Sequence, residues 1–349
     1  MKLAILYLTR GGQRLAKDLA QRITGAEVFS EVSSKNIPKN IPKNIPAATG
    51  LSKLIEKNWN KYDGFVFIMA AGIVVRSIAP HIRDKRTDPA VVVVDEKGRF
   101  AISLLSGHLG GANDLARQVA DALGGQAVIT TASDTLGLTA LDTWAKKQGL
   151  IAENPETLTK ASAVMVNTGR IRVYSPGYTG ELPADFIITN EAAEANLIIS
   201  NQTASSNGTE WPAEAAILRP KNLVVGLGCN RGTPASEIYE ALLEILSKYN
   251  LSRLSIRNLA SIDLKSDEPG LLELAEENGW KIRFYSKNEL NMVPGVSRSE
   301  AVLKATGAVA VAEPAALLSA GTKTLLVGKM KWKNVTIAIA QSKITFKAD

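Results

Sequence analysis

The chain has 349 residues, of which 45% are hydrophobic and 21% are charged. This length predicts two or three domains with cores of their own, and the composition excludes an intrinsically disordered chain. A single cysteine, Cys229, excludes an internal disulfide framework, and because the chain has only two histidines a protein-bound metal site is not expected.

The net charge of +7 is compatible with an anionic partner, and the sequence favours a small molecule over nucleic acid. Aromatic residues make up only 5% of the chain, and no basic run with interleaved aromatics or nucleic-acid-binding motif is present. The apolar stretch 65–75 is too short to span a bilayer, and the amino terminus lacks the features of a signal peptide. We therefore expect a cytoplasmic protein without nucleic-acid or membrane partners. A charge that serves only solubility explains the +7 equally well.

Alternating strands and helices predict a doubly wound α/β domain over residues 1–148. Runs of β-branched and aromatic residues at 65–69 and 91–94 predict buried parallel strands, and the turn DEKG predicts a hairpin. The repeat NIPKNIPKNIP at 36–46 predicts an extended surface loop. The expected strands are 2–8, 27–30, 64–69, 91–94, 99–104 and 127–130, and the expected helices are 13–23, 51–59, 72–81, 110–123 and 139–147.

Two further α/β domains are expected after residue 148. Short strands separated by turn residues predict a small middle domain over 149–219. The segment NLVVGLGCNRGTPASEIYEALLEIL at 222–246 then reads as strand, glycine turn and helix, with Thr233 as the helix cap, and it opens a C-terminal domain over 220–349. The expected strands are 171–174, 185–189, 195–200 and 215–218 in the middle domain, and 255–260, 281–285, 324–327 and 335–340 in the C-terminal one.

His108 is the leading candidate for acid–base chemistry. It follows strand 99–104 and precedes a helix start, where backbone amides favour negative charge. Asp134 and Thr131 follow strand 127–130 of the same sheet and can converge on His108, because ligand sites lie at the ends of strands. A histidine that only bonds within its turn is an equally good explanation, and helix capping is the simpler account of Asp134. Ser106 lies nearby, but a serine-nucleophile motif is absent.

Clustered cations in the same block are candidates for binding substrate carboxylates. Arg76 and Lys85 can pair with such groups, and Asp88 lies among them. The alternative is a solvated, salt-bridged surface, which is the commoner role of a charge cluster.

The turn GLGCNRGTP of the C-terminal domain is a candidate anion cradle. Its glycine spacing matches neither GxGxxG nor GxxxxGK, the two common nucleotide-binding motifs. The amides at the helix start, together with Arg231, can still hold a carboxylate or phosphate. Cys229 in this turn is either a thiol of lowered pKa or, more commonly, a small buried hydrophobe. Glu313, just before Pro314, is either a base or a helix N-terminal acid.

Several ordered motifs resemble those of one family. AGIVVRSIAP, DKRTDPAVVVVDEKGRFAISLLSGHLGGANDLA and VITTASD look like the signature of the cobalamin-biosynthesis family CbiG, the cobalt-precorrin-5A hydrolases. LVVGLGCNRGTPASEI, LASIDLKSDEPGLLELA and VSRSEAVLKATGAVAVAEPAALLSAG are similar to the carboxy-terminal domain of that family, which is related to the standalone protein CobE. The resemblance covers nearly the whole chain.

The resemblance implies a step of anaerobic vitamin B12 synthesis. The implied substrate is a cobalt-bearing tetrapyrrole whose ring-A acetate is closed as a δ-lactone; water opens the lactone and the two-carbon unit at C20 leaves as acetaldehyde. No cofactor is expected, since the cobalt is carried by the substrate. The implied partners are this small molecule and, transiently, other enzymes of the pathway. The alternative is a non-enzymatic protein that binds the tetrapyrrole and hands it on.

This reaction needs an acid or base, donors for oxyanion charge and cations for peripheral carboxylates. We predict His108 as the acid or base, with Asp134 or Glu313 as its supporting carboxylate. Amides around Gly110 and Gly111 are the expected donors, and a cleft joining the first and third domains is the expected site. The expected substrate-binding residues are Arg76, Lys85, Asp88, Ser106, Gly107, Gly110, Gly111, Asn113, Thr131, Gly228, Asn230 and Arg231.

Overall fold

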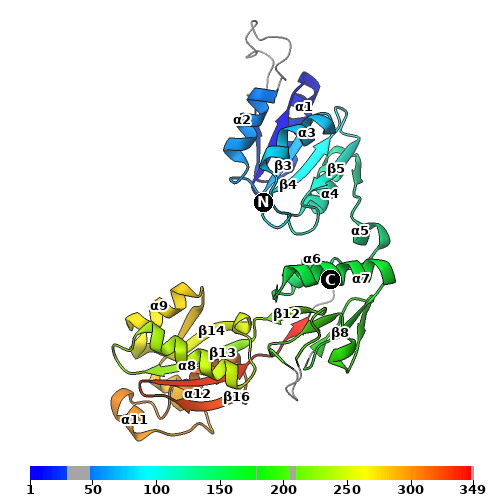
Figure 1. Cartoon of the computed structure of the whole chain (residues 1–349). Helices are drawn as coiled ribbons and strands as arrows, with labels where there is room; N and C mark the ends of the chain where they lie inside the picture. The colour runs from blue at the N-terminus through cyan, green and yellow to red at the C-terminus, as the bar shows by residue number, and fades with distance from the viewer. Residues whose placement is uncertain (30–47, 178, 205–209, 347–349) are drawn as a thin grey trace. The chain divides into compact units, whose positions relative to one another are not determined.

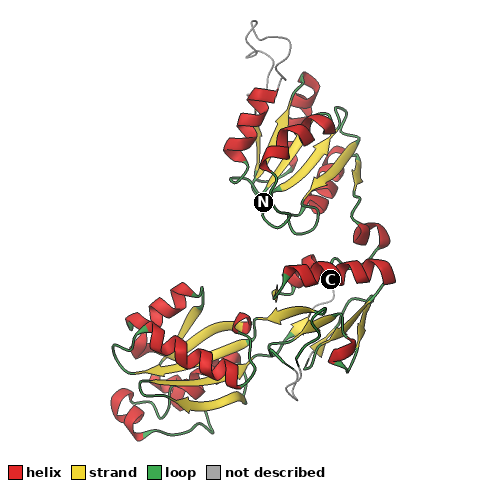
Figure 2. Cartoon of the chain, in the orientation of Figure 1, coloured by secondary structure: helices red, strands yellow, loops and turns green. Residues whose placement is uncertain are grey.

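The computed structural model describes residues 1–29, 48–177, 179–204 and 210–346, so the proline-rich segment 36–46 lies outside the described residues. The chain divides into two compact units, Met1–Thr143 and Trp144–Asp349 (Figure 1). Both units combine helices with mainly parallel sheets, which confirms the predicted α/β class (Figure 2). No helix within the described ranges has the length and apolar character needed to cross a membrane.

The first unit is built on a six-stranded sheet of order β2-β1-β3-β4-β5-β6. Every residue of β3 and β4 is buried and the two strands are parallel, as the apolar runs predicted. Strand β5 is antiparallel to β4 and parallel to β6, so the predicted hairpin is confirmed. The bounds are β1 Leu3–Tyr7, β2 Ala26–Phe29, β3 Gly64–Ile68, β4 Ala90–Val94, β5 Phe100–Leu105 and β6 Gln126–Val128.

Helices cover both faces of this sheet, which confirms the doubly wound prediction. Side chains of α1 (Arg10–Arg22) and α4 (Ala112–Leu123) pack in the core of one face. Those of α2 (Ala48–Asn58) and α3 (Ala71–Ile78) pack in the core of the other. Pro80 ends α3 early, in the 3-10 turn Ala79–His81, because proline cannot continue the α-helical hydrogen bonding.

The reversal of β5 decides where the end of each strand lies. Strands β1 to β4 are parallel, whereas β5 and β6 run the other way. The carboxyl ends of β5 and β6 therefore lie at the edge of the sheet that holds the amino ends of β3 and β4. Two short helices follow β6, namely α5 (Ala132–Leu136), which the sequence did not predict, and α6 (Leu141–Lys147).

The second unit begins with a five-stranded sheet of order β10-β8-β11-β12-β7. Helix α7 (Pro155–Thr168) was not predicted, because its buried face holds only Leu158, Ala161 and Met165. Buried Arg219 bonds to Glu153 and to two backbone carbonyls. The bounds are β7 Leu150–Ala152, β8 Ile171–Tyr174, β10 Phe186–Ile188, β11 Leu197–Ile199 and β12 Ala216–Pro220, with β9 Thr179–Gly180 paired to β18 Thr345–Phe346 and a 3-10 turn at Ala192–Glu194.

A second five-stranded sheet, of order β15-β14-β13-β17-β16, follows in the same unit. One face packs against α8 (Ala235–Lys248) and α9 (Pro269–Glu277), and the other against α12 (Ala312–Ala320). The remaining bounds are β13 Leu223–Cys229, β14 Ile256–Ile262, β15 Lys281–Tyr285, β16 Leu325–Lys331, β17 Val335–Gln341, α10 Lys287–Asn291 and α11 Glu300–Thr306, with 3-10 turns at Arg253–Ser255 and Asp263–Lys265.

The start of α8 differs from its prediction. Its cap is Pro234, which makes no side-chain cap hydrogen bond, and the Thr233 hydroxyl instead donates to the carbonyl of Asn230. The predicted threonine cap is wrong because this hydroxyl bonds back into the turn that leaves β13.

Gly226 lets α12 approach strand β13. A Cβ atom built at Gly226 would lie 1.9 Å from the backbone oxygen of Ala312, whereas one built at Gly228 has no neighbour closer than 3.8 Å. We expect Gly226→Ala to destabilise the chain by about 1–3 kcal/mol, as overpacking of a core usually does. Gly228→Ala is the matched control on the same strand. The midpoint of urea unfolding measures both, and equal midpoints for the two variants would contradict the steric argument.

Candidate active site

The turn between β5 and α4 is tightly constrained. Ser106 has a φ of 59°, a left-handed conformation that costs a non-glycine residue free energy. Gly110 packs against it so closely that a Cβ atom there would lie 2.4 Å from the Ser106 Cβ. A Cβ atom at Gly107 would lie 2.8 Å from Asn113 Oδ1. The glycines of this turn are therefore required by packing, and they fix where His108 lies.

Ser106 also carries a buried polar atom without a partner. Its side chain is 8% exposed, and its Oγ makes no hydrogen bond within the described part of the chain. A strained backbone and an unsatisfied buried hydroxyl are both costly, and such features are concentrated at functional sites.

The structure brings His108 into contact with Asp134, which is one of the two carboxylates predicted as its partner. His108 Nε2 lies 2.9 Å from Asp134 Oδ2, and Ser133 Oγ lies 3.1 Å from the same nitrogen. The contact forms because β5 and β6 are parallel neighbours that end at the same edge, so the residues after each strand meet. Asp134 is not the helix cap of the simpler account, since Thr131 occupies the cap position of α5.

Asp134 is the centre of a hydrogen-bond network. Its Oδ2 also accepts from the Thr131 hydroxyl at 2.7 Å and from Asn113 Nδ2 at 2.9 Å, and its Oδ1 accepts from Arg117 Nη2 at 2.5 Å. Burial works to raise the pKa of this carboxyl, but the bonds from Thr131, Arg117 and His108 outweigh burial and hold the pKa below its ordinary value. Asp134 is therefore a carboxylate at neutral pH.

A second carboxylate, Asp142, lies on the other side of the imidazole. Its Oδ1 is 3.6 Å from His108 Nδ1, and its side chain is 22% exposed. Sequence reasoning missed this residue, because Asp142 lies in the first turn of α6, where an acid is expected for helix stability alone. His108 thus has a carboxylate facing each ring nitrogen.

Three amides at the start of α4 bond back to carbonyls of the turn. Gly111 N donates to the carbonyl of His108, and the next two amides donate to the carbonyls of Ser106 and Gly107. The predicted role of the Gly111 amide as an oxyanion donor is therefore wrong, whereas the same role for the Gly110 amide stays a prediction. Gly111 instead lines a hollow of about 660 Å³ beside Arg22 and Asp114.

The predicted cations fall into two groups. Arg76 lies in the last turn of α3, a helix that begins at the edge of the sheet opposite His108. Lys85 lies in the segment that leads into β4, which reaches the edge where His108 lies. Both side chains are exposed and make no hydrogen bond or ion pair within the described ranges. Asp88 is buried and accepts the backbone amide of Arg83, so it braces this segment.

The glycine turn after β13 is not a free anion cradle. Glu268, which is fully buried, accepts the Gly232 amide at 2.7 Å and the Lys265 ammonium at 2.9 Å. Arg231 bonds to Asp267 and lies 3.7 Å from Glu268. The prediction of an external anion here is corrected, because a carboxylate of the chain itself occupies the position.

Gly228, Asn230, Cys229 and Glu313 line a different hollow of the second unit, of about 240 Å³. Burial raises the pKa of the Cys229 thiol, which agrees with its role as a small, partly buried hydrophobe and not with a reactive thiolate. Glu313 belongs to the second unit and His108 to the first. Its carboxylate accepts the amides of Ser297 and Lys329, so the structure gives it a bracing role.

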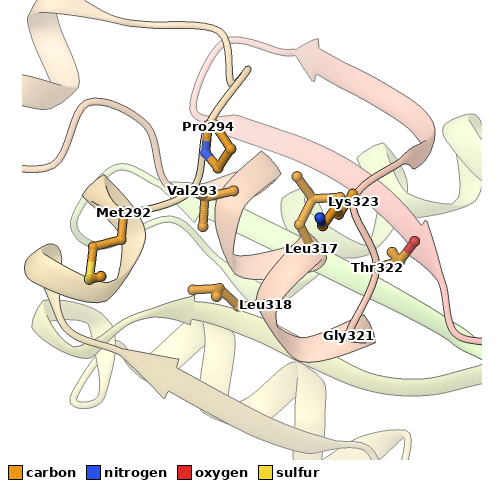
Figure 3. A pocket seen from close by; sticks show the side chains of 8 residues that line it. All are labelled: Met292, Val293, Pro294, Leu317, Leu318, Gly321, Thr322 and Lys323. Atoms are coloured by element: carbon orange, nitrogen blue, oxygen red, sulfur yellow. The ribbon is translucent and has the colours of Figure 1, made fainter.

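One more hollow of the second unit, of about 440 Å³, is mainly apolar. Figure 3 shows that its side chains come from the end of α12 and from the segment after α10. It lacks the convergent polar groups that chemistry requires. Its lining residues are Met292, Val293, Pro294, Leu317, Leu318, Gly321, Thr322 and Lys323.

Comparisons with known proteins agree with the sequence motifs. Three family models match in order: cobalamin synthesis G N-terminal at residues 53–134, cobalamin biosynthesis central region at 139–220, and cobalamin synthesis G C-terminus at 223–340. The cobalt-precorrin-5A hydrolase of Priestia megaterium is 38% identical over 97% of this chain and 94% of that protein. The chain belongs to the cobalamin synthesis G family. The resemblance expected from the motifs is thereby confirmed.

Two other relatives extend this result. The cobalt-precorrin-5A hydrolase of Salmonella typhimurium is 33% identical over 97% of both chains. Protein CobE of a Sinorhizobium species is 35% identical over 121 residues, which cover 34% of this chain and 79% of that protein. The His108 turn and Asp134 both lie within the match to the N-terminal model.

Replacing Asp134 tests its network through the pH dependence of stability. Because the folded-state pKa lies below the ordinary value of 3.8, the stabilisation is complete above about pH 4 and is lost as the pH falls through the folded-state pKa. We expect Asp134→Asn to lower the free energy of unfolding at pH 7 by about 1–3 kcal/mol, since it removes hydrogen bonds to a charged group.

The free energy of urea unfolding at pH 7, 5 and 3.5 measures this effect. The loss of unfolding free energy in Asp134→Asn, relative to the native chain, should be equal at pH 7 and 5 and smaller at pH 3.5. Asp114→Asn is the control, because Asp114 also pairs with Arg117 but is 71% exposed. A deficit for Asp134→Asn that grows on acidification would contradict the assignment.

Proposed function

We propose that this chain is a cobalt-precorrin-5A hydrolase that opens the ring-A δ-lactone of its substrate and releases acetaldehyde. The observation that carries the proposal is the contact of His108 Nε2 with Asp134 Oδ2, because lactone hydrolysis needs an oriented group that moves protons. The names of the two hydrolases that align over nearly the whole chain support the same substrate.

Asp134 orients the imidazole. Since an ionised carboxylate can only accept, His108 holds a proton on Nε2 toward Asp134, and Nδ1 becomes the nitrogen that exchanges protons. Nδ1 faces Asp142, whose charge stabilises the imidazolium that forms when Nδ1 takes a proton. His108 thus works between two carboxylates, one that fixes the tautomer and one that balances the charge.

Ring opening then follows ordinary ester hydrolysis. Nδ1 takes a proton from water as the water oxygen attacks the lactone carbonyl, and a tetrahedral oxyanion forms. The oxyanion collapses, the bond between the acyl carbon and the ring oxygen breaks, and the imidazolium returns its proton to the C20 oxygen. The products of this step are the free acetate arm and a C20 alcohol.

Carbon–carbon cleavage completes the reaction. The C20 hydroxyl loses its proton, and the electron pair left on that oxygen forms the second bond of the aldehyde carbonyl. The bond between C20 and the macrocycle breaks at the same time, and its electron pair passes to the macrocycle, which takes up a proton. One water is consumed and one acetaldehyde leaves, so no oxidant or reductant is required. Lys85, on the segment that leads to the His108 edge, is the cation we assign to a peripheral carboxylate at this site.

The second candidate is a protein that binds the tetrapyrrole and hands it on without changing it. The same cations serve both functions. Turnover separates them: purified protein incubated with cobalt-precorrin-5A releases acetaldehyde in one case and only retains the tetrapyrrole in the other.

Replacing His108 tests its role in catalysis directly. We expect His108→Gln to lower the kcat for acetaldehyde release by roughly 10²-fold or more, because general acid–base catalysis contributes at least that much. His81→Gln is the control, since His81 is the other histidine of the chain and packs against Trp59. Release is measured by reduction of the aldehyde with NADH and alcohol dehydrogenase.

The control should retain the kcat of the native chain, and circular dichroism should show that both variants are folded. An unchanged kcat in His108→Gln would remove this residue from the mechanism. Binding without acetaldehyde release by the native chain would favour the handover protein.

A further inference from the structure

The hollow of about 240 Å³ in the second unit is lined by several parts of the C-terminal sheet region, including the start of α12 and the turn after β14. The other walls are the end of β13, the β16–β17 hairpin around Trp332, and the segment from Ser297 to Thr306. Two residues predicted to bind substrate, Gly228 and Asn230, lie in this wall. We call this hollow the lysine cleft.

Four lysines line the lysine cleft, and three of them have no carboxylate partner. Lys265 is paired with Glu268 at 2.9 Å. The Lys329 ammonium reaches only the backbone oxygen of Ser297, at 3.3 Å. Lys331 and Lys333 are exposed and make no hydrogen bond or ion pair within the described residues. Sequence reasoning missed these lysines because they lie on a hairpin with no glycine turn or helix start.

One acid, Glu313, belongs to the lining of the lysine cleft, and its hydrogen bonds are already made within the chain. Glu313 is 5% exposed, and it accepts the Ser297 amide at 2.5 Å, the Ser297 hydroxyl at 3.2 Å and the Lys329 amide at 3.0 Å. These bonds brace two walls against each other. The lining therefore holds three lysines without a carboxylate partner beside one acid, Glu313, and so carries excess positive charge. Glu237 and Glu244 lie outside the lining and bond to Asn334 and Trp332.

Apolar side chains complete the lining. Ile262, Val302, Val311 and Trp332 contribute to it. A cleft with apolar walls and unpaired lysines suits a ligand that is flat and apolar in its body and carboxylated at its periphery. A hollow of about 240 Å³ holds one arm and the edge of such a molecule, not the whole ring.

We propose that the lysine cleft is a carboxylate-binding site that receives a peripheral acetate or propionate arm of the tetrapyrrole. This inference rests on the proposed function for the identity of the ligand. It adds a binding contact made by Lys331 and Lys333, separate from the proton transfer by His108. Replacing these lysines should then weaken binding without slowing the chemical step.

Quenching of tryptophan fluorescence by uroporphyrin III, a tetrapyrrole with acetate and propionate arms, tests the inference without turnover. The double variant Lys331→Gln/Lys333→Gln should raise the Kd about ten-fold, which corresponds to about 1.4 kcal/mol. Lys331→Arg/Lys333→Arg keeps the charge and should restore the affinity. Lys281→Gln/Lys323→Gln removes two exposed lysines elsewhere in the unit and should leave the Kd unchanged. Trp332→Phe shows how much of the quenching comes from Trp332, which lies in the lining of the cleft.

Kinetics with cobalt-precorrin-5A separate this inference from the proposed function. The Lys331→Gln/Lys333→Gln variant should show a KM raised about ten-fold and an unchanged kcat. Equal Kd and KM in this variant and in the native chain would overturn the lysine cleft, even if acetaldehyde is released normally. Loss of uroporphyrin binding in the variant, with no acetaldehyde from the native chain, would support the lysine cleft and overturn the hydrolase.

Discussion

The proposed chemistry depends on one partly buried carboxylate, that of Asp134. It accepts hydrogen bonds from His108, Thr131, Asn113 and Arg117, which come from the ends of two strands and from helix α4. Burial works to raise the pKa of this carboxyl, and the surrounding donors outweigh burial and hold the pKa below its ordinary value. The bond from His108 to Asp134 also fixes the tautomer of the imidazole. The network that holds the loops together is therefore the one that prepares His108 for proton transfer.

The topology of the sheet makes this network possible. If β5 ran parallel to β4, the residues after β5 would lie at the edge where α3 begins, far from the amino ends of the central strands. The hairpin reverses β5, β6 follows it in parallel, and the two loops after them meet. The strained conformation of Ser106 and the tight packing of Gly107 and Gly110 then fix the turn that carries His108.

Much of the fold could be predicted, because buried parallel strands have continuous apolar runs and the hairpin has a turn signal. A pairing of His108 with Asp134 could be expected, since both follow strands of one sheet, but the sequence left Glu313 open as the alternative partner. Asp142 could not, because its position depends on how α6 packs. The prediction of an anion site at the glycine turn was wrong, because nothing in GLGCNRGTP shows that the carboxylate of Glu268, far along the chain, bonds to this turn.

A double-mutant cycle on kcat tests the central claim, that His108 and Asp134 act as one unit. Acetaldehyde release is measured for His108→Gln, for Asp134→Asn and for the double variant under saturating cobalt-precorrin-5A. If Asp134 acts through the imidazole, the double variant is about as slow as His108→Gln alone, because groups that work as a unit have non-additive effects. A double variant slowed by the product of the two single losses would contradict the account.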